Sequence, residues 1–193
     1  MKKSENWDST QAYTGEFKNI TPGGHICKIV QAKQDFTDDG RELLIILFDI
    51  AEGEFKDFYK DQFDIKKAAN AEAKWQGIYR QLTEGKSEPF YKGLITCIEN
   101  SNPGYKWNFD ENTLKGKLFG GVFGQEEYLN DKGETKLSTK CRFIRSVEAV
   151  RKGVQVPEIK KLQEAGGNTT TTTATTNQSA FGKDVFPDEE IPF

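Results

Sequence analysis

The chain has 193 residues, of which 30% are charged and 35% hydrophobic, which is enough to bury one core with tails around it. No run of about 18 or more apolar residues occurs, and no apolar segment follows Lys2 and Lys3, so the sequence predicts a cytoplasmic protein without a membrane span or secretory signal. The three cysteines, at positions 27, 97 and 141, lack the spacing of a disulfide framework or a zinc site and are expected to be reduced and buried.

The net charge of -3 is concentrated near the end of the sequence. Residues 181–193 hold four acids and one lysine, and residues 166–180 are uncharged, which leaves 26 acids and 26 bases in residues 1–165. A balanced body does not by itself indicate nucleic-acid binding, because phosphates require a local stripe of cations. Any phosphate-binding surface must therefore come from the cations of individual strands.

The first third of the sequence predicts an N-terminal arm and three strands. Residues 1–23 are mostly polar and end in a turn signal, TPGG, and residues 25–33 (HICKIVQAK) have strand composition and precede an Asp-Asp-Gly turn. Residues 41–51 (RELLIILFDIA) form a nearly continuous apolar run, which is typical of a central strand covered on both faces. Residues 54–63 (EFKDFYKDQF) follow a Glu-Gly turn and are expected to form a hairpin with that strand.

Two helices and further strands are predicted after residue 63. Residues 64–82 are rich in Ala, Lys and Gln and have apolar residues three and four positions apart. Residues 87–104 begin with a capping serine and an early proline and end at Pro-Gly. Strand composition returns in residues 105–109 (YKWNF), 114–129 and 135–150, and the turn NDKGE separates the last two as a hairpin.

Three strands, a helical insert and at least two more strands follow the order of the OB-fold, a five-stranded Greek-key barrel that binds oligonucleotides. We therefore expect a mainly β protein, with an OB-fold barrel over residues 24–165, the helical insert between strands 3 and 4, and a disordered C-terminal tail. Gly120 and Gly121, inside the fourth strand, suit the bends of a barrel. A small mixed α+β sandwich is the alternative.

Three of the expected strands carry side chains suited to nucleic acid. Because side chains alternate along a strand, residues 136–142 present a basic face, residues 56–60 a ring between two ammonium groups, and residues 105–109 a row of rings. Cations neutralise phosphates and rings stack on bases. The candidate DNA-binding residues are Lys56, Phe58, Lys60, Tyr105, Trp107, Lys136, Lys140 and Arg142. The alternative is that the cations only solvate exposed faces and that the rings at 105–109 belong to the core.

No motif of a catalytic site occurs in the sequence. His25 is the single histidine and has no serine or cysteine nucleophile motif around it, and neither a GxxxxGK[ST] loop nor a GxGxxG turn is present. The adjacent acids at 38–39 and 126–127 would point to opposite faces of a strand or solvate a turn. We therefore expect a protein that is not an enzyme and needs no metal or cofactor.

The last 28 residues have the composition of a tether with a binding peptide at its end. Residues 166–180 (GGNTTTTTATTNQSA) predict a flexible linker, and residues 181–193 are acidic and end in Ile-Pro-Phe. A partner with an apolar pocket beside a cation would bind the last ring and the terminal carboxylate together, and its basic rim would attract the acids. The candidate partner-binding residues are Asp188, Glu189, Glu190, Ile191, Pro192 and Phe193.

The ending DEEIPF after a low-complexity linker resembles that of bacterial and phage single-stranded-DNA-binding proteins. Within the body, LLIILFDIAEGEF (43–55), NPGYKWNFD (102–110) and LKGKLFGGVFGQEEY (114–128) are similar to proteins of this kind from phages and mobile elements of Gram-positive bacteria. The resemblance implies sequence-tolerant binding and protection of single-stranded DNA in replication, recombination and repair, with recruitment of partner enzymes through residues 188–193. A strand-annealing mediator and a tail-based adaptor or inhibitor without DNA binding are the alternatives, and association into a homo-oligomer is left open.

Overall fold

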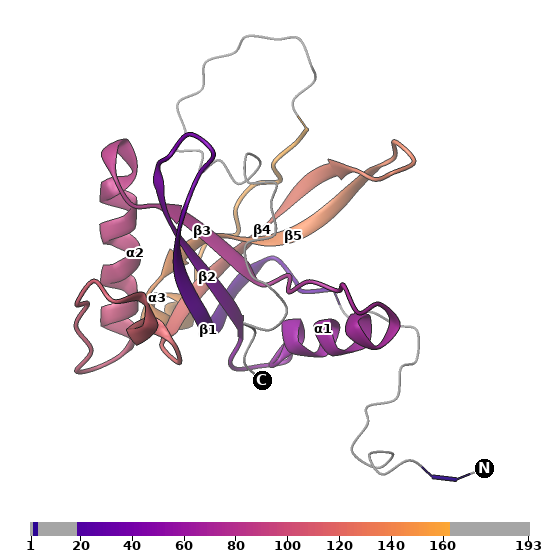
Figure 1. Ribbon diagram of the computed structural model, residues 1–193, viewed down its shortest axis with the longest axis horizontal. Helices are drawn as coiled ribbons and strands as arrows, with labels where there is room; N and C mark the ends of the chain where they lie inside the picture. The colour runs from indigo at the N-terminus through magenta and orange to yellow at the C-terminus, as the bar shows by residue number, and fades with distance from the viewer. Residues whose placement is uncertain (1, 4–18, 163–193) are drawn as a thin grey trace.

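The computed structural model describes residues 2–3 and 19–162, which form a mainly β structure with three α-helices (Figure 1). Most of the expected N-terminal arm, the linker at 166–180 and the tip at 181–193 lie outside the described residues. The elements in chain order are β1 (Gly23–Phe36), β2 (Glu42–Ile50), α1 (Phe58–Ala69), β3 (Ile78–Leu82), α2 (Glu88–Ser101), β4 (Leu118–Leu129), β5 (Thr135–Arg145) and α3 (Val147–Lys152), with short 3-10 turns at Gly85–Ser87 (η1) and Glu111–Leu114 (η2).

The five strands form one antiparallel sheet in the order β3-β2-β1-β4-β5. β1 lies at the centre: it pairs with β2 from Cys27 to Phe36 and with β4 through Gly23–Lys28. A bulge between Ile29 and Gln31 follows the β4 pairing, and bulges increase the local twist of a strand. The sheet is therefore bent at β1, with β2 and β3 on one side and β4 and β5 on the other (Figure 1).

The prediction of a central apolar strand at 41–51 is confirmed, since all residues of β2 after Glu42 are buried. Phe48 lies in the middle of the core, and its ring makes edge contacts with Tyr59 of α1 and with Phe119 and Phe123 of β4. The prediction of a helix at 87–104 is also confirmed by α2, which buries Leu94, Ile95 and Ile98 as the spacing indicates. Rings and aliphatic side chains from both halves of the sheet thus share one core.

The prediction for residues 54–82 is wrong in two places. The expected strand at 54–63 is mostly helix α1, because Phe55, Tyr59 and Phe63 recur every four residues and all three are buried. The expected helix at 64–82 stops at Ala69, and its last five residues form strand β3 instead. β3 pairs with β2 from Leu82 to Ile78, so pairing with a strand already in the sheet overrides the weak helical pattern.

Two further strand predictions are corrected. Residues 105–109 form a loop, because their backbone is held by side chains of α2: the Trp107 N–H donates to Glu99 Oε1 at 2.9 Å. The expected strand at 135–150 ends at Arg145, where Ser146 caps helix α3 by accepting from the Ala149 N–H at 3.3 Å.

The expected closed barrel is not observed. Among residues 19–162 no strand pairing joins β3 to β5, so the sheet stays open at these two edges. α2 lies between them and lines a cavity of about 280 Å³ with Tyr79 and Gln81 of β3 and with Phe143–Arg145 of β5. A helix that fills the space between two sheet edges prevents their direct hydrogen bonding.

Candidate nucleic-acid interface

A groove of about 500 Å³ lies between α1 and the hairpin formed by β4 and β5. Phe48 of β2 and Ile78 at the start of β3 also line it. The side chains along the groove include four rings, four amides, two hydroxyls and one ammonium group: Phe48, Phe58, Tyr59, Tyr128, Asn19, Gln62, Gln76, Gln125, Ser138, Thr139 and Lys140. No aspartate or glutamate lines it, although the chain has 30 of them.

Asp49 of β2 positions the α1 wall of this groove. The residue before the helix, Asp57, has a left-handed backbone and makes no side-chain cap, so the first N–H groups of α1 need another acceptor. The buried Asp49 carboxylate accepts from the N–H groups of Tyr59 at 2.9 Å and Lys60 at 3.0 Å. Burial raises the pKa of Asp49, although these hydrogen bonds act in the opposite direction. The strand thereby fixes the first turn of α1, where Phe58 and Tyr59 lie.

The opposite wall is the outer part of the β4–β5 hairpin, which extends beyond the rest of the sheet (Figure 1). Its turn is held by Asn130, whose side-chain oxygen accepts from the N–H groups of Lys132 and Glu134 at 3.0 and 2.9 Å. On its other edge, β4 is bridged by the segment after α3, because Lys160 exchanges backbone hydrogen bonds with Gln125 and Glu127. The hairpin is therefore held at its turn and along the outer edge of β4, and it presents the Tyr128 ring, which is 44% exposed.

The predicted cations next to the groove are largely paired with carboxylates. Lys140 forms an ion pair with Glu126, Lys136 with Glu134 at 3.3 Å and Lys60 with Asp64 at 2.5 Å. Arg142 does not line the groove; its guanidinium lies 5.8 Å from the centroid of the Phe143 ring. Lys56 is exposed in the turn before α1. The expected basic stripe is thus mostly neutralised within the protein, and a phosphate has to compete with these carboxylates.

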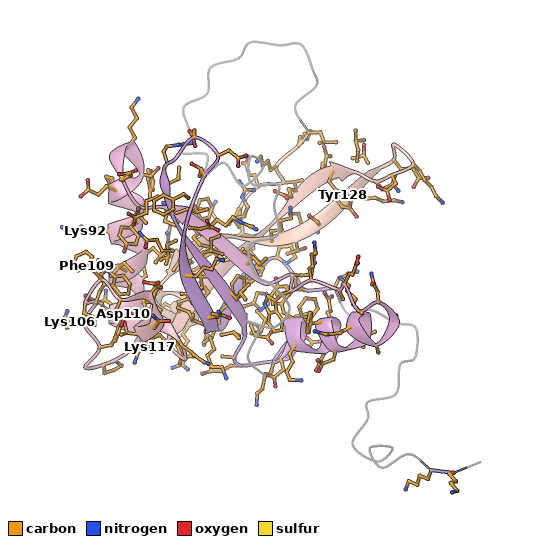
Figure 2. The ribbon with its side chains drawn as sticks, in the orientation of Figure 1. Lys92, Lys106, Phe109, Asp110, Lys117 and Tyr128 are labelled. Atoms are coloured by element: carbon orange, nitrogen blue, oxygen red, sulfur yellow. The ribbon has the colours of Figure 1, made fainter. Side chains whose placement is uncertain are left out.

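Two of the predicted site residues, Phe58 and Lys140, are far apart in the sequence and line the same groove. Tyr105 and Trp107 do not line it. The Tyr105 hydroxyl is 2.9 Å from Thr113 Oγ1, and Lys117 Nζ is 4.6 Å from the centroid of its ring. Trp107 is half-buried beside α2, in a second pocket at the other end of the sheet. Figure 2 shows this separation: Lys117 and Phe109 lie at one end of the molecule and Tyr128 on the hairpin at the other.

The sequence reasoning missed Tyr128, Leu137 and the three glutamines of the groove. Tyr128 and Leu137 are exposed, large and close to the hairpin turn, so a ring or aliphatic side chain next to the NDKGE turn was an available signal. The glutamines come together only through the tertiary fold and had no sequence signal. The partner-binding candidates at 188–193 lie outside the described residues.

Within the described part of the chain, no helix is long and apolar enough to cross a membrane, and no group of three or more metal-ligating side chains comes together. All three cysteines are free; Cys27 and Cys141 are buried, and Cys97 is half-buried. The chain matches no protein-family model and no curated protein, so the interpretation of the groove rests on its geometry and composition.

Proposed function

We propose that the chain is a sequence-tolerant single-stranded-DNA-binding protein and that the groove between α1 and the β4–β5 hairpin holds the DNA. The observation that carries this proposal is the lining of the groove: rings, amides, hydroxyls and a lysine, with no carboxylate among the lining residues. Rings stack on bases of any sequence, amides and hydroxyls bind base edges and sugars, and the absence of acids avoids repulsion of phosphates.

The arrangement of elements around the groove supports an OB-like architecture. The strand order β3-β2-β1-β4-β5 and the position of α2 between β3 and β4 agree with that fold, although the pairing that would close the barrel is absent from the described residues. OB-folds bind oligonucleotides on the face of strands 2 and 3 and through the loop that joins strands 4 and 5. Phe48 of β2 and Ile78 of β3 line the groove, and so does Tyr128, which lies at the end of β4 beside the loop that joins it to β5.

Stacking is expected to contribute more to this binding than charge. Phe58 and Tyr128 lie on opposite walls of the groove, so each offers a ring to a different base of a strand passing between them. Lys140 and Lys136 already have carboxylate partners, so contact with a phosphate replaces one ion pair by another and gains little. The recruitment of replication and recombination enzymes belongs to the same proposal and rests on the sequence of residues 188–193.

The test is the affinity of the full-length protein for a fluorescently labelled oligothymidylate, measured by anisotropy, against the same measurement with a duplex. Phe58→Ala and Tyr128→Ala should each weaken single-strand binding by about tenfold, since a stacked base contributes about 1–3 kcal/mol. Phe90→Ala is the matched control, because Phe90 is 54% exposed on α2 and does not line the groove. Equal affinity for single strand and duplex, or an equal loss in the Phe90 variant, would exclude the groove as the DNA site.

A further inference from the structure

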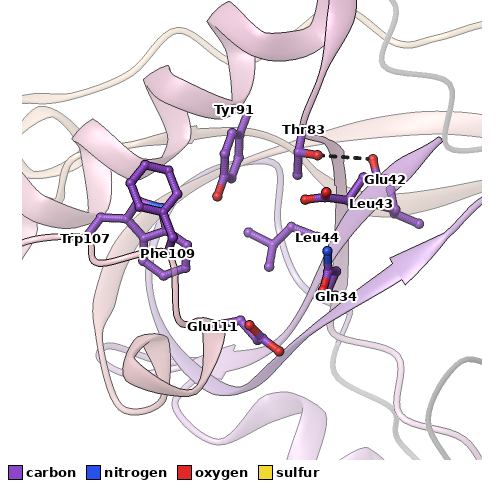
Figure 3. Close-up of a pocket in the computed structure, with 9 residues that line it drawn as sticks. All are labelled: Gln34, Glu42, Leu43, Leu44, Thr83, Tyr91, Trp107, Phe109 and Glu111. Carbon is purple, nitrogen blue, oxygen red and sulfur yellow. Dashed lines mark hydrogen bonds between the residues drawn. The ribbon is translucent and has the colours of Figure 1, made fainter.

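A second cavity, of about 250 Å³, lies at the other end of the sheet, between α2, the loop at 105–111 and the strands β1 and β2 (Figure 3). Tyr91 extends into it from α2, Trp107 and Phe109 form one wall, and Leu43 and Leu44 are apolar lining residues on the strand side. The cavity shares no lining residue with the groove proposed for DNA. It is therefore a separate site with its own chemistry.

The aromatic wall is preformed and directed outward. The Trp107 and Phe109 ring centroids are 6.0 Å apart, and Phe109 is 81% exposed at a backbone φ of 64°, a left-handed conformation that is unusual for a large residue. The loop is fixed in this shape by Glu99, which accepts from the Trp107 N–H, and by Asn108, whose side-chain oxygen accepts from the Asp110 N–H at 3.2 Å. A ring held exposed in a strained backbone indicates a contact surface rather than a folding core.

The charged side chains that line this cavity are carboxylates. Glu42 and Glu111 line it, no lysine, arginine or histidine does, and neither carboxylate forms an ion pair with the described residues. Figure 3 shows the Glu42 carboxylate and the Tyr91 hydroxyl directed into the same space. Burial raises the pKa of Tyr91, the neighbouring Trp107 side chain acts in the opposite direction, and the charges of Glu42 and Glu111 raise it further. Glu84 adds a third carboxylate beside the cavity, 3.4 Å from the Glu42 N–H.

We propose that this cavity binds a cationic side chain, above all an arginine, of a protein partner. Three rings and two carboxylates without an internal cation form a site complementary to a guanidinium group, which stacks on aromatic faces and donates to carboxylates through a planar fork. The apolar lining of Leu43 and Leu44 suits the methylene stem that carries the guanidinium.

Two other candidate occupants, DNA and the acidic tip of this chain, are excluded by their negative charge. DNA phosphates and the acidic residues 188–190 of this chain are repelled by Glu42 and Glu111, so neither the proposed DNA ligand nor the chain's own tip fits the cavity. An uncharged nucleobase would find rings here and, in the Trp107 indole, a buried N–H that meets no acceptor at hydrogen-bonding geometry in the described residues. It would leave the two carboxylates without a positive partner, however, which favours the cation.

The probe is the capped tripeptide acetyl-Gly-Arg-Gly-amide, titrated into ¹⁵N-labelled full-length protein while the Trp107 indole N–H resonance is followed. The resonance should shift in a saturable manner, and the isosteric citrulline tripeptide should bind at least about fivefold more weakly because it lacks the charge. Phe109→Ala and the conservative double variant Glu42→Gln/Glu111→Gln should each reduce the affinity for the arginine peptide by a similar factor. The lysine tripeptide should bind, but more weakly than the arginine peptide.

Phe90→Ala and Glu88→Gln are the matched controls, because both residues lie on α2 outside the cavity, and these variants should bind the arginine peptide like the unchanged protein. Equal binding of the citrulline peptide, or unchanged arginine binding in the double variant, would overturn the proposal. So would deoxycytidine shifting the Trp107 resonance more strongly than the arginine peptide does, since that result would assign the cavity to a nucleobase. Affinity for oligothymidylate should stay unchanged in all these variants, so the outcome here is independent of the DNA-binding test.

Discussion

Replacing Asp49 by alanine tests whether strand β2 holds the α1 wall of the groove. Asp49 is 5% exposed, and its carboxylate accepts from three backbone N–H groups, those of Ile50 at 2.8 Å, Tyr59 at 2.9 Å and Lys60 at 3.0 Å. Two of these donors belong to the first turn of α1 and have no other cap. Asp49→Ala therefore leaves buried donors without a partner and should both destabilise the protein and loosen the turn that carries Phe58.

The size of the effect follows from two opposing contributions. Each hydrogen bond to a charged group contributes about 1.5–3 kcal/mol, but the buried carboxylate also costs free energy to desolvate, which is why the pKa of Asp49 is raised. We expect Asp49→Ala to lower the free energy of unfolding by about 2–4 kcal/mol. Asp49→Asn keeps one acceptor and turns an amide toward the remaining N–H, so it should cost about 1–2 kcal/mol. Urea denaturation followed by circular dichroism measures both.

The pH dependence gives an independent check, with the sign set by the raised pKa. Because the folded protein holds the Asp49 proton more tightly than the unfolded chain, this group stabilises the fold most when it is protonated. Its contribution falls as pH rises from the unfolded pKa of about 3.9 through the raised folded value, and stays low above it. The stability advantage of the unchanged protein over Asp49→Asn should therefore shrink as pH rises across that window.

Asp38→Ala is the control, because Asp38 is exposed in the β1–β2 turn and should change stability by less than about 0.5 kcal/mol. A loss below about 0.5 kcal/mol in Asp49→Ala would refute the capping role. An advantage over Asp49→Asn that grows with pH would show that the hydrogen bonds outweigh burial in setting the pKa of Asp49.

Three further predictions concern the DNA, the sheet and the tip. A plot of log affinity for oligothymidylate against log salt concentration should have a slope of about -1 to -3, which corresponds to about two to four phosphate contacts. A slope steeper than about -5 would contradict a groove whose cations are already paired. Gly77→Ala should cost about 3 kcal/mol in urea denaturation, because its Cβ would lie 2.2 Å from the Phe48 carbonyl oxygen, whereas Gly93→Ala, in open space on α2, should stabilise by about 0.5–1 kcal/mol. Deleting residues 188–193 should abolish capture of replication enzymes and leave oligothymidylate affinity equal or higher; loss of DNA binding with partners still captured would reverse the assignment.

Elements whose signal is local could be predicted from the sequence. The apolar run of β2, the early proline and apolar spacing of α2 and the NDKGE turn between β4 and β5 each specify their structure within a few residues, whereas the expected capping serine, Ser87, makes no side-chain cap. Residues 54–63 carry two periods at once, since Lys56, Phe58 and Lys60 alternate while Phe55, Tyr59 and Phe63 recur every four. The choice between them is made by Asp49, which caps α1 from a neighbouring strand and has no signature in the segment itself.

The remaining errors also come from tertiary contacts. β3 is only five residues long and becomes a strand because Gly77 allows the backbone to approach Phe48, whose amide donates to the Gly77 carbonyl at 2.8 Å. Residues 105–109 look like a strand by alternation, but the Tyr105 N–H donates to the Asn102 carbonyl and the Trp107 N–H to the Glu99 carboxylate, which replaces the hydrogen bonds of a neighbouring strand. Phe58 and Lys140 could be identified as site residues from the sequence. That they line one groove depends on how α1 and the hairpin pack, which the sequence does not indicate.

A body with equal numbers of acids and bases still has two surfaces of opposite character, because the carboxylates are unevenly placed. Beside the groove, Glu126 forms an ion pair with Lys140 and Glu134 with Lys136, and neither glutamate lines the groove. At the other end, Glu42 and Glu111 face into the cavity and have no cation beside them in its lining. The same residue type therefore neutralises cations beside the groove at one end and leaves a cavity lined by carboxylates without cations at the other. DNA in the groove and an arginine-bearing partner in the cavity would bind at the same time, because the two sites attract opposite charges. A single surface of uniform charge would not allow this.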